Sequence, residues 1–346
     1  MTHPRRDLSS VANTDIMPAM TERFYPLLFT PVYKDYIWGG QRIPQFYQRR
    51  GAPAVCAESW EISTHPDGMS HVAEGPFAGL TLAALATRLG QALTGTRAPR
   101  PKQFPLLLKL IDARENLSVQ VHPGDENAGL VGGEPKTEMW CVLDRTPGAL
   151  LYAGLKSGTT LASFRESMSC GTAPDCLFRL DVAPGDALFI PGGLVHAIGA
   201  GCLIYEVQQT SNTTYRLYDW GRFDTDGQPR PLHLQQAFQV INPDLPMPCM
   251  IRPPPLRAGA ADPWTNVLTC RYFRLRRLDL RQTAAVTLDG ATFYALFVTN
   301  GAATATAGGV TVRLLAGSSC LIPAAAGTLA LEPLVGTATV LVTTLI

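Results

Sequence analysis

The sequence is built from short apolar runs that Gly, Pro and Asp interrupt, and this pattern restricts the fold more than any other feature. Such spacing is typical of antiparallel sandwiches and barrels. Helical periodicity occurs chiefly at 80–93, 159–168 and 232–241. The strand-like runs are 25–33, 57–63, 104–112, 117–122, 138–144, 149–155, 177–182, 187–191, 202–210 and 213–220. We therefore predict a mainly all-β protein with a few helical insertions.

A short internal repeat indicates how the strands are grouped. "PGDALFIPGGLVH" (184–196) and "AGSSCLIPAAAGT" (316–328) both place four residues between a glycine and Ile-Pro. A glycine turn, an apolar strand and a proline turn in two copies predict two β-barrels of the same kind. The second copy has Thr328 where the first has His196, and no histidine follows His233. A histidine-based site is therefore expected in the first barrel alone.

The Pro-rich stretch 242–263 is the expected boundary between the barrels. We predict a disordered leader over 1–22, a catalytic barrel domain with helical insertions over 23–245, and a second, metal-free β domain over 256–346.

Composition limits the classes of partner. The chain is 46% apolar and 16% charged, with a formal net charge of +1, which indicates a globular protein without a basic surface for nucleic acid. A small anionic substrate would have to be attracted by a few placed cations.

Cysteine usage and hydropathy indicate the compartment. Eight cysteines occur without a C-x-x-C pair, mostly among apolar neighbours, and this predicts reduced, mostly buried thiols in a cytoplasmic protein. The most apolar late stretch, 334–346, is too short to span a bilayer, so we expect no membrane association.

One strand carries an unusual polar face. Ser118, Gln120 and His122 alternate with apolar residues and so point to the same side. Glu138 lies on another predicted strand, and His196 follows an apolar strand and a Pro-Gly-Gly turn. Two histidines and a carboxylate on strands of a small barrel indicate a metal site, since such strands converge on the interior. The same set also suits a non-haem iron oxygenase, so spacing alone does not name the metal.

Several motifs in order carry a family resemblance. "YIWGG", "ESWEISTHPDG", "SVQVHP", "PKTEMW", "IPGGLVHAIGAG" and "YEVQQTSNTTYRLYDWGR" together resemble type I phosphomannose isomerase in its short bacterial form, over about residues 24–240. The resemblance implies two cupin (jelly-roll) barrels, one zinc ion per chain, and interconversion of mannose 6-phosphate and fructose 6-phosphate. Monomers or small homo-oligomers are expected.

Carried over by motif, the resemblance implies a set of site residues. The zinc ligands are Gln120, His122, Glu138 and His196, with Arg216 and Lys136 as catalytic cations. Lys109 and Ser118 are implied as phosphate contacts, and Trp38, Glu58 and Glu206 as further pocket residues. His65 and Asp67 we interpret as turn-forming.

Asn212 departs from the family, which usually has aspartate there. An amide cannot act as a general base, so either Asn212 only hydrogen-bonds the sugar, or the role in ring opening or proton transfer considered for that aspartate does not hold in this branch of the family.

The implied chemistry needs these residue types. Aldose–ketose isomerisation proceeds through an enediol, and negative charge grows on the sugar oxygens. Zinc with two imidazoles, one amide and one carboxylate keeps a formal charge of +1, which stabilises such charge, and Arg216 and Lys136 add to it. The general base stays open between Glu206, Lys136 and a zinc-bound hydroxide.

Two other functions fit part of the pattern. An iron oxygenase would use His122, Glu138 and His196, but a fourth ligand at Gln120 and the pocket cations argue against it. A non-catalytic sugar-binding cupin is less consistent with the presence of both Arg216 and Lys136.

Overall fold

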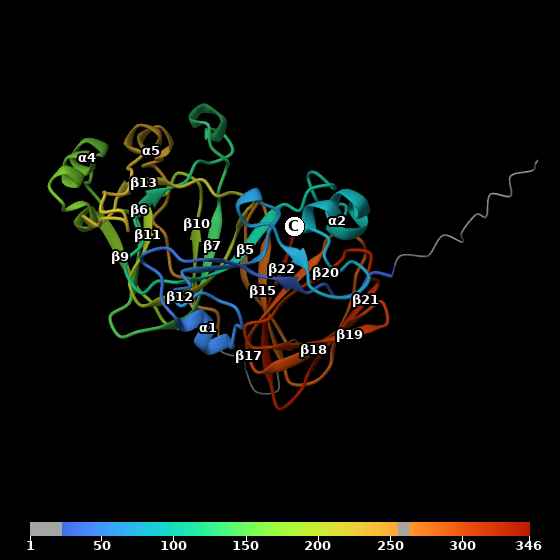
Figure 1. The fold of residues 1–346 in the computed structure, drawn as a ribbon. Coiled ribbons are helices and arrows are strands. Elements are labelled where there is room, and N and C mark those ends of the chain that lie inside the picture. The colour runs from blue at the N-terminus through green and yellow to red at the C-terminus, as the bar shows by residue number, and fades with distance from the viewer. Residues whose placement is uncertain (1–22, 255–262) are drawn as a thin grey trace, which may run out of the picture.

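A computed structural model describes residues 23–254 and 263–346. The predicted leader at 1–22, and the part of the predicted boundary at 255–262, lie outside the described residues. Two antiparallel β-barrels stand side by side, one coloured mainly green to yellow and the other orange to red (Figure 1). The prediction of a mainly all-β fold with a few helices is confirmed.

The first barrel consists of two facing sheets. One has the strand order β10 (Ala187–Ile190), β7 (Glu138–Arg145), β12 (Cys202–Gln209), β5 (Leu106–Asp112), β3 (Glu58–Ile62) and β2 (Val32–Lys34). The other has the order β13 (Tyr215–Tyr218), β6 (Val119–Val121), β11 (His196–Ile198), β8 (Leu150–Leu155) and β9 (Leu177–Asp181). A separate pair joins β1 (Phe29–Thr30) to β4 (His71–Val72).

The second barrel repeats this plan on a smaller scale. Its larger sheet has the order β14 (Trp264–Thr269), β15 (Arg274–Leu280), β22 (Ala338–Thr344), β17 (Tyr294–Asn300) and β20 (Ser319–Ile322). Its smaller sheet has the order β16 (Ala284–Thr287), β21 (Thr328–Pro333), β18 (Ala302–Ala307) and β19 (Val310–Leu315).

The internal repeat occupies equivalent places in the two barrels. Gly185 and Gly317 have φ of 91° and 85°, a conformation that glycine adopts without strain, and each precedes the edge strand of its larger sheet, β10 or β20. The chain then turns at proline and enters the opposite sheet at His196 in one barrel and at Thr328 in the other. The repeat is therefore structural as well as sequential.

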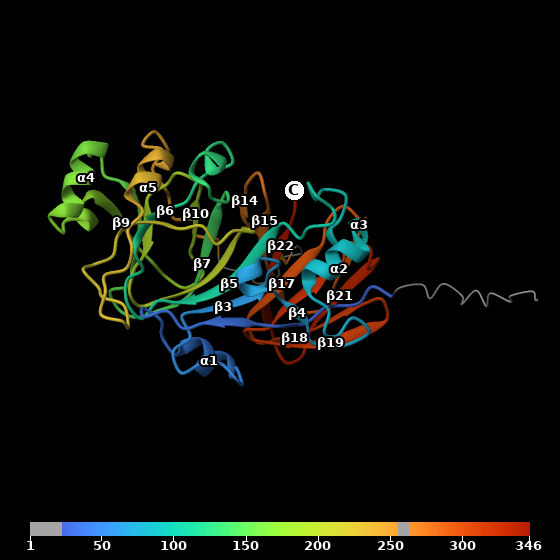
Figure 2. The same cartoon turned by 45° about the horizontal axis from the view of Figure 1, so that its top comes forward.

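The helices lie on the outside of the barrels. α4 (Leu161–Ser169) and α5 (Leu234–Val240) cover the outer face of the five-stranded sheet, as the rotated view shows (Figure 2). α2 (Leu82–Leu89) and α3 (Gln91–Thr94) pack at the second barrel, where the backbone of Ala324 donates to Leu93. Side chains of Thr81 and Thr160 cap α2 and α4 at their N-termini. All three helical predictions are confirmed.

One helix lacks a clear sequence signal. α1 (Arg42–Tyr47) is short, and Pro44 lies at its third position, where a missing N–H costs little. None of the helices in the described part of the chain is long and apolar enough to cross a membrane.

The barrels share a large apolar interface. Tyr205 of β12 stacks on Phe297 of β17 with ring centroids 4.6 Å apart, and Phe104 lies 4.6 Å from Phe293. The N-terminal segment belongs to both units, because Leu27 exchanges backbone hydrogen bonds with Leu321 of β20. The proposed domain division within residues 245–256 therefore stays a prediction.

The eight cysteines are free, as predicted, but fewer are buried than expected. Four are buried, two are partly exposed, and Cys170 and Cys249 are exposed.

Candidate active site and metal centre

One cross-strand row of side chains in each sheet of the first barrel faces the interior. In the six-stranded sheet, Trp60, Lys109, Glu206 and Trp140 are successive partners across β3, β5, β12 and β7. In the five-stranded sheet, Arg216, Gln120 and His196 are partners across β13, β6 and β11. Residues far apart in the sequence therefore meet because strand pairing aligns them on one face.

His122, Glu138 and His196 form the candidate metal centre. Their ligand atoms all lie within 4.8 Å of one another, and all three side chains are buried. Nε2 of His122 is 3.5 Å from Glu138 Oε2, and Nε2 of His196 is 3.4 Å from Glu138 Oε1. The amide of Gln120 lies 3.3 Å from His196 Nε2, so the fourth predicted ligand adjoins the same centre.

The donor set fits a cation. Nδ1 of His196 donates to the carbonyl of Leu194 (2.8 Å), which leaves the lone pair on Nε2 facing the centre. Both carboxylate oxygens of Glu138 are buried, and apart from their ionic contacts with Lys136 and the two histidines they have no hydrogen-bond partner in the described structure. The Lys136 ammonium lies 3.0 Å from Glu138 Oε2 and 3.1 Å from His122 Nε2. These acceptors thus converge on positive charge, and two imidazoles with a carboxylate are the ligands that zinc prefers.

Burial and charge set the protonation states at this centre. Burial and the neighbouring Lys136 ammonium lower the pKa of His122 to about 3. Burial also lowers the pKa of His196. For Glu138, burial acts to raise the pKa, but Lys136 and the two imidazoles outweigh it and hold the pKa well below its usual value. The histidines are therefore neutral and the glutamate ionised at neutral pH, which is the state that binds a metal.

A second buried network lies beside the metal centre. Lys109 Nζ is 3.1 Å from Glu206 Oε1 and 3.4 Å from Glu58 Oε1. The second oxygen of each carboxylate accepts from an indole: Trp140 Nε1 donates to Glu206 (2.8 Å) and Trp60 Nε1 donates to Glu58 (2.7 Å). Two tryptophans therefore fix two carboxylates around one ammonium.

The pKa values of Lys109 and Glu206 in this network are both raised, for different reasons. Burial acts to lower the pKa of Lys109, but the carboxylates of Glu206 and Glu58 outweigh it, so the pKa is raised and the ammonium stays charged. Burial and the charge of Glu138 raise the pKa of Glu206 to about 7, against the opposing effect of Lys109. Glu206 therefore exchanges a proton near neutral pH.

A cavity of about 260 Å³ opens onto both networks. It is lined by Tyr36, Trp38, Glu58, Lys109, Ile111, Leu117, Ser118, Gln120, Lys136, Ile198, Glu206, Asn212, Thr214, Arg216 and Arg230. Every residue of the predicted site thus lies at this cavity or at the adjoining metal centre. Tyr36, Thr214 and Arg230 were not identified from the sequence, because isolated residues in turns and loops carry no periodic signal.

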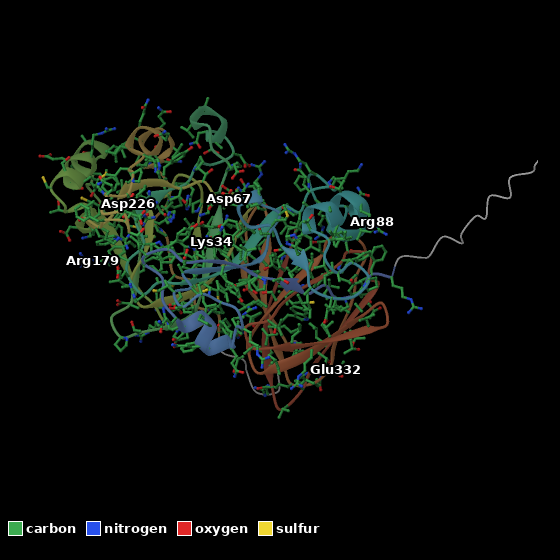
Figure 3. The ribbon with its side chains drawn as sticks, in the orientation of Figure 1. Lys34, Asp67, Arg88, Arg179, Asp226 and Glu332 are labelled. Carbon is green, nitrogen blue, oxygen red and sulfur yellow. The ribbon has the colours of Figure 1, made fainter. Side chains whose placement is uncertain are left out.

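Asn212 lies at the mouth of this cavity and contacts Asp67. The Asn212 amide donates to Asp67 Oδ2 (2.7 Å), and the backbone carbonyl of Asp67 accepts from Lys34. Lys34 and Asp67 lie on the same side of the first barrel (Figure 3). An aspartate at 212 would face a second carboxylate here, so the amide suits this environment.

His65 and Asp67 occupy a short 3₁₀ turn at Pro66–Gly68, in which the His65 side chain accepts from the Asp67 backbone N–H. The turn-forming interpretation agrees with this geometry.

Two family models and several curated relatives match this chain. A family model described as the catalytic domain of type I phosphomannose isomerase matches residues 27–139, and one described as the cupin domain of mannose-6-phosphate isomerase matches residues 264–344. The chain is 37% identical over 272 residues to mannose-6-phosphate isomerase ManA of Bacillus subtilis, covering 75% of this chain and 81% of that protein. It is 35% identical over 220 residues to a Streptococcus mutans mannose-6-phosphate isomerase, covering 62% of this chain and 67% of the relative.

Solved structures of mannose 6-phosphate isomerases match the fold of this chain. The crystal structure of the Bacillus subtilis mannose 6-phosphate isomerase matches with a TM-score of 0.81 at 30% identity, covering 92% of this chain and 99% of that one. A zinc-bound mannose 6-phosphate isomerase matches with a TM-score of 0.73 at 15% identity, covering 92% and 98% of the two chains. At that identity the second match supports the fold alone.

Proposed function

The chain belongs to the type I phosphomannose isomerase family, and from this premise we propose that it interconverts mannose 6-phosphate and fructose 6-phosphate with one zinc ion per chain. The observation that carries the proposal is the buried set of His122, Glu138 and His196, with Gln120 beside it, at a cavity lined by four cationic side chains. The proposed ligands are these four residues. When bound, zinc supplies Lewis-acid stabilisation of negative charge on the substrate oxygens.

The reaction moves a proton between the two carbons at one end of the open-chain sugar through an enediol. Glu206 is the proposed general base, because it lines the cavity and its pKa is raised to about 7. A carboxyl group with such a pKa both accepts and returns a proton near neutral pH. The Lys109 ammonium at 3.1 Å and the Trp140 indole at 2.8 Å hold its two oxygens in place.

Arg216 and Lys136 are the proposed charge-stabilising groups. Arg216 is the ladder partner of Gln120, and Lys136 lies 3.0 Å from Glu138, so both flank the metal ligands. Fixed cations at these places stabilise an enediolate without reorganisation.

Trp38, Ser118, Asn212 and Lys109 are proposed to contact the substrate. Ser118 lies beside Gln120, and its hydroxyl is 3.4 Å from the Gln120 amide oxygen. Lys109 is compensated by two carboxylates, which favours contact with sugar hydroxyls over contact with phosphate.

A coupled assay of mannose 6-phosphate conversion, run before and after exhaustive chelation and again after zinc is restored, tests the proposal. We expect activity to be lost and then regained in step with zinc content. Full activity in protein shown to be free of metal would refute the zinc requirement. Metal analysis of protein purified without added metal would separate zinc from the iron expected of an oxygenase.

The enediol step has its own test. Turnover in deuterium oxide should introduce solvent deuterium at the carbon that receives the proton, because Glu206 exchanges its proton with water. A reaction that never incorporates solvent deuterium would instead indicate a hydride shift.

A further inference from the structure

The cavity contains a cation that the proposed chemistry leaves without a role. Four lysines and arginines line it. Lys136 contacts Glu138, and Lys109 lies between two carboxylates. Arg216 lies opposite Gln120 on the neighbouring strand. The remaining one, Arg230, comes from outside the barrel strands.

Arg230 reaches the cavity on a hairpin that leaves β13 and returns beside it. Asp224 N donates to Gln228 O (2.7 Å), and Phe223 forms a bridge with Pro229, so the two arms stay together. The returning arm is attached to β13, because His233 N donates to Arg216 O (2.8 Å). Figure 3 labels Asp226 at the tip of this hairpin, on the side of the first barrel away from the second.

Buried Asp219 holds both arms of this hairpin. Its Oδ1 is 2.5 Å from Arg222 Nη2 and 3.4 Å from Arg230 Nη1. Arg222 also donates to the backbone carbonyl of Asn116 (2.6 Å), so its guanidinium is held by the barrel itself. Arg230 keeps the longer and weaker of the two contacts with Asp219, and its side chain is 15% exposed. Its guanidinium therefore has donors left for a ligand.

Two arginines, Arg216 and Arg230, line this wall of the cavity. Arg216 makes no ion pair with any carboxylate in the described residues; its Nη1 donates to the carbonyl of Pro231 (2.7 Å), and its buried Nε has no partner there. Burial and the nearby charge of Arg230 lower the pKa of Arg216. Arg222 and Arg230 thus share the carboxylate of Asp219, while Arg216 beside them has no carboxylate partner among the described residues. An anion bound here would reduce the mutual repulsion of the three guanidiniums.

Given the proposed function, we propose that Arg230 binds the phosphate group of the sugar phosphate and so determines the preference for phosphorylated over free hexose. Asp219 and Arg222 are positioning residues that hold its guanidinium. The phosphate is at the opposite end of the sugar from the reacting carbons, so its ligand should line the same cavity without belonging to the metal centre. A guanidinium fork also matches phosphate oxygens in geometry.

Lys109 is the competing assignment for the phosphate contact. Its ammonium already faces Glu58 and Glu206, and a phosphate placed there would be a third anionic group at one cation. The charge balance therefore favours Arg230.

The first test compares steady-state kinetics of Arg230→Met with the wild type and with Arg114→Met. Arg114 has a side chain that is 58% exposed and does not line the cavity. Losing a hydrogen bond to a charged group costs about 1.5–3 kcal/mol, so KM for mannose 6-phosphate should rise about 10–100-fold in Arg230→Met, with kcat nearly unchanged. Arg114→Met should resemble the wild type, and Arg216→Met should lower kcat instead.

The second test measures binding of inorganic phosphate by calorimetry, with zinc-loaded and with metal-free protein. Arg230→Met should lose affinity for phosphate by a similar factor in both forms. Loss in the zinc-loaded form alone would place the phosphate on the metal and overturn the assignment. An unchanged phosphate affinity, or a fall in kcat without a rise in KM, would do the same.

These outcomes are separable from a failure of the proposed function. If the wild type does not convert mannose 6-phosphate, the function is refuted, while phosphate calorimetry still decides the role of Arg230. If Arg230→Met melts well below the wild type, Arg230→Gln, which retains hydrogen bonding to Asp219, takes its place in both measurements.

Discussion

The interiors of the two barrels differ far more than their scaffolds do. In the first barrel, one row across the larger sheet reads Trp60, Lys109, Glu206 and Trp140. In the second, an interior row of the larger sheet reads Leu278, Val340 and Val298. Both rows are fully or almost fully buried. The same kind of sheet therefore holds either the proposed active site or an apolar core, and the interior-facing residues decide which.

The two interiors are stabilised in different ways. Small and large apolar residues, such as Ala303, Ala305, Leu329 and Leu331, fill the second barrel and gain free energy through burial. The polar half of the first barrel instead needs a partner for every buried charge, because an unpaired one is strongly destabilising. The paired charges thus fix the positions of these side chains, but they also make the interior of the first barrel less tolerant of substitutions.

The second barrel also supports the site from behind. Tyr205 and Glu206 are neighbours on β12 and point to opposite faces, so Glu206 faces the cavity while Tyr205 stacks on Phe297. A partly buried ion pair between Arg49 and Glu61 (2.9 Å), with Ser319 also donating to Glu61, strengthens the same junction. We infer that the second barrel fixes the sheet that carries Lys109 and Glu206.

The largest expected effect comes from giving the first barrel the residue that the second has at the equivalent place. His196→Thr removes a proposed zinc ligand, and kcat/KM should fall by about a thousandfold or more, since a Lewis acid contributes several kcal/mol. Zinc stoichiometry and kinetics on one preparation measure it. The reciprocal change, Thr328→His at an exposed position, should leave both values unchanged. A fully active, zinc-loaded His196→Thr would break the comparison.

Lys109→Met tests the different tolerance of the two interiors. It leaves the carboxylates of Glu58 and Glu206 without their ammonium, and the free energy of unfolding should fall by about 3–5 kcal/mol. Leu296→Met in the core of the second barrel is the control, expected to cost less than about 1.5 kcal/mol. Denaturant unfolding measures both, and equal costs would mean that the polar network is no more demanding than the apolar core.

Gln120→Glu sharpens the comparison by changing charge at nearly constant shape. If Gln120 is a ligand, glutamate should keep zinc or bind it more tightly, because a carboxylate is the better oxygen donor. The formal charge of the ion with its ligands would fall from +1 to zero, so kcat should fall by about tenfold as part of the stabilising field is lost. Unchanged activity would place Gln120 away from the ion, and a misfolded protein would mean that its strand position is more constrained than we infer.

The smallest expected effect is a shift in the pH at which zinc is released. Because the pKa of His122 is lowered to about 3 and that of His196 is also lowered, both imidazoles stay neutral below the ordinary histidine pKa of about 6.5. Protons compete with the metal only as the pH falls towards the lowered values, so the midpoint of zinc release should lie below 6.5. Zinc content after equilibration at pH 8 to 4 measures it, and a midpoint above 6.5 would contradict the effect of burial.

Local sequence patterns determined much of the fold. Alternation with a period of two indicated which residues of 117–122 share a face, and three helices followed from their period of 3.6. The glycine-to-proline repeat indicated equivalent edge strands in two barrels. The candidate ligands could be named because strands direct alternate side chains into a barrel, and because six motifs in order resemble a known family. α1 had no such signal.

Tertiary structure alone decided how these pieces meet. Lys109 lies between Glu58 and Glu206 because β5 pairs with both β3 and β12, and no local pattern encodes pairing across so many residues. Arg230 reaches the cavity because one hydrogen-bonded hairpin returns beside β13, and Leu27 joins β20 from the other end of the chain. Sequence periodicity specifies the direction of a side chain relative to its own strand, whereas the identity of its neighbours depends on long-range pairing and on the burial gained when the whole chain packs.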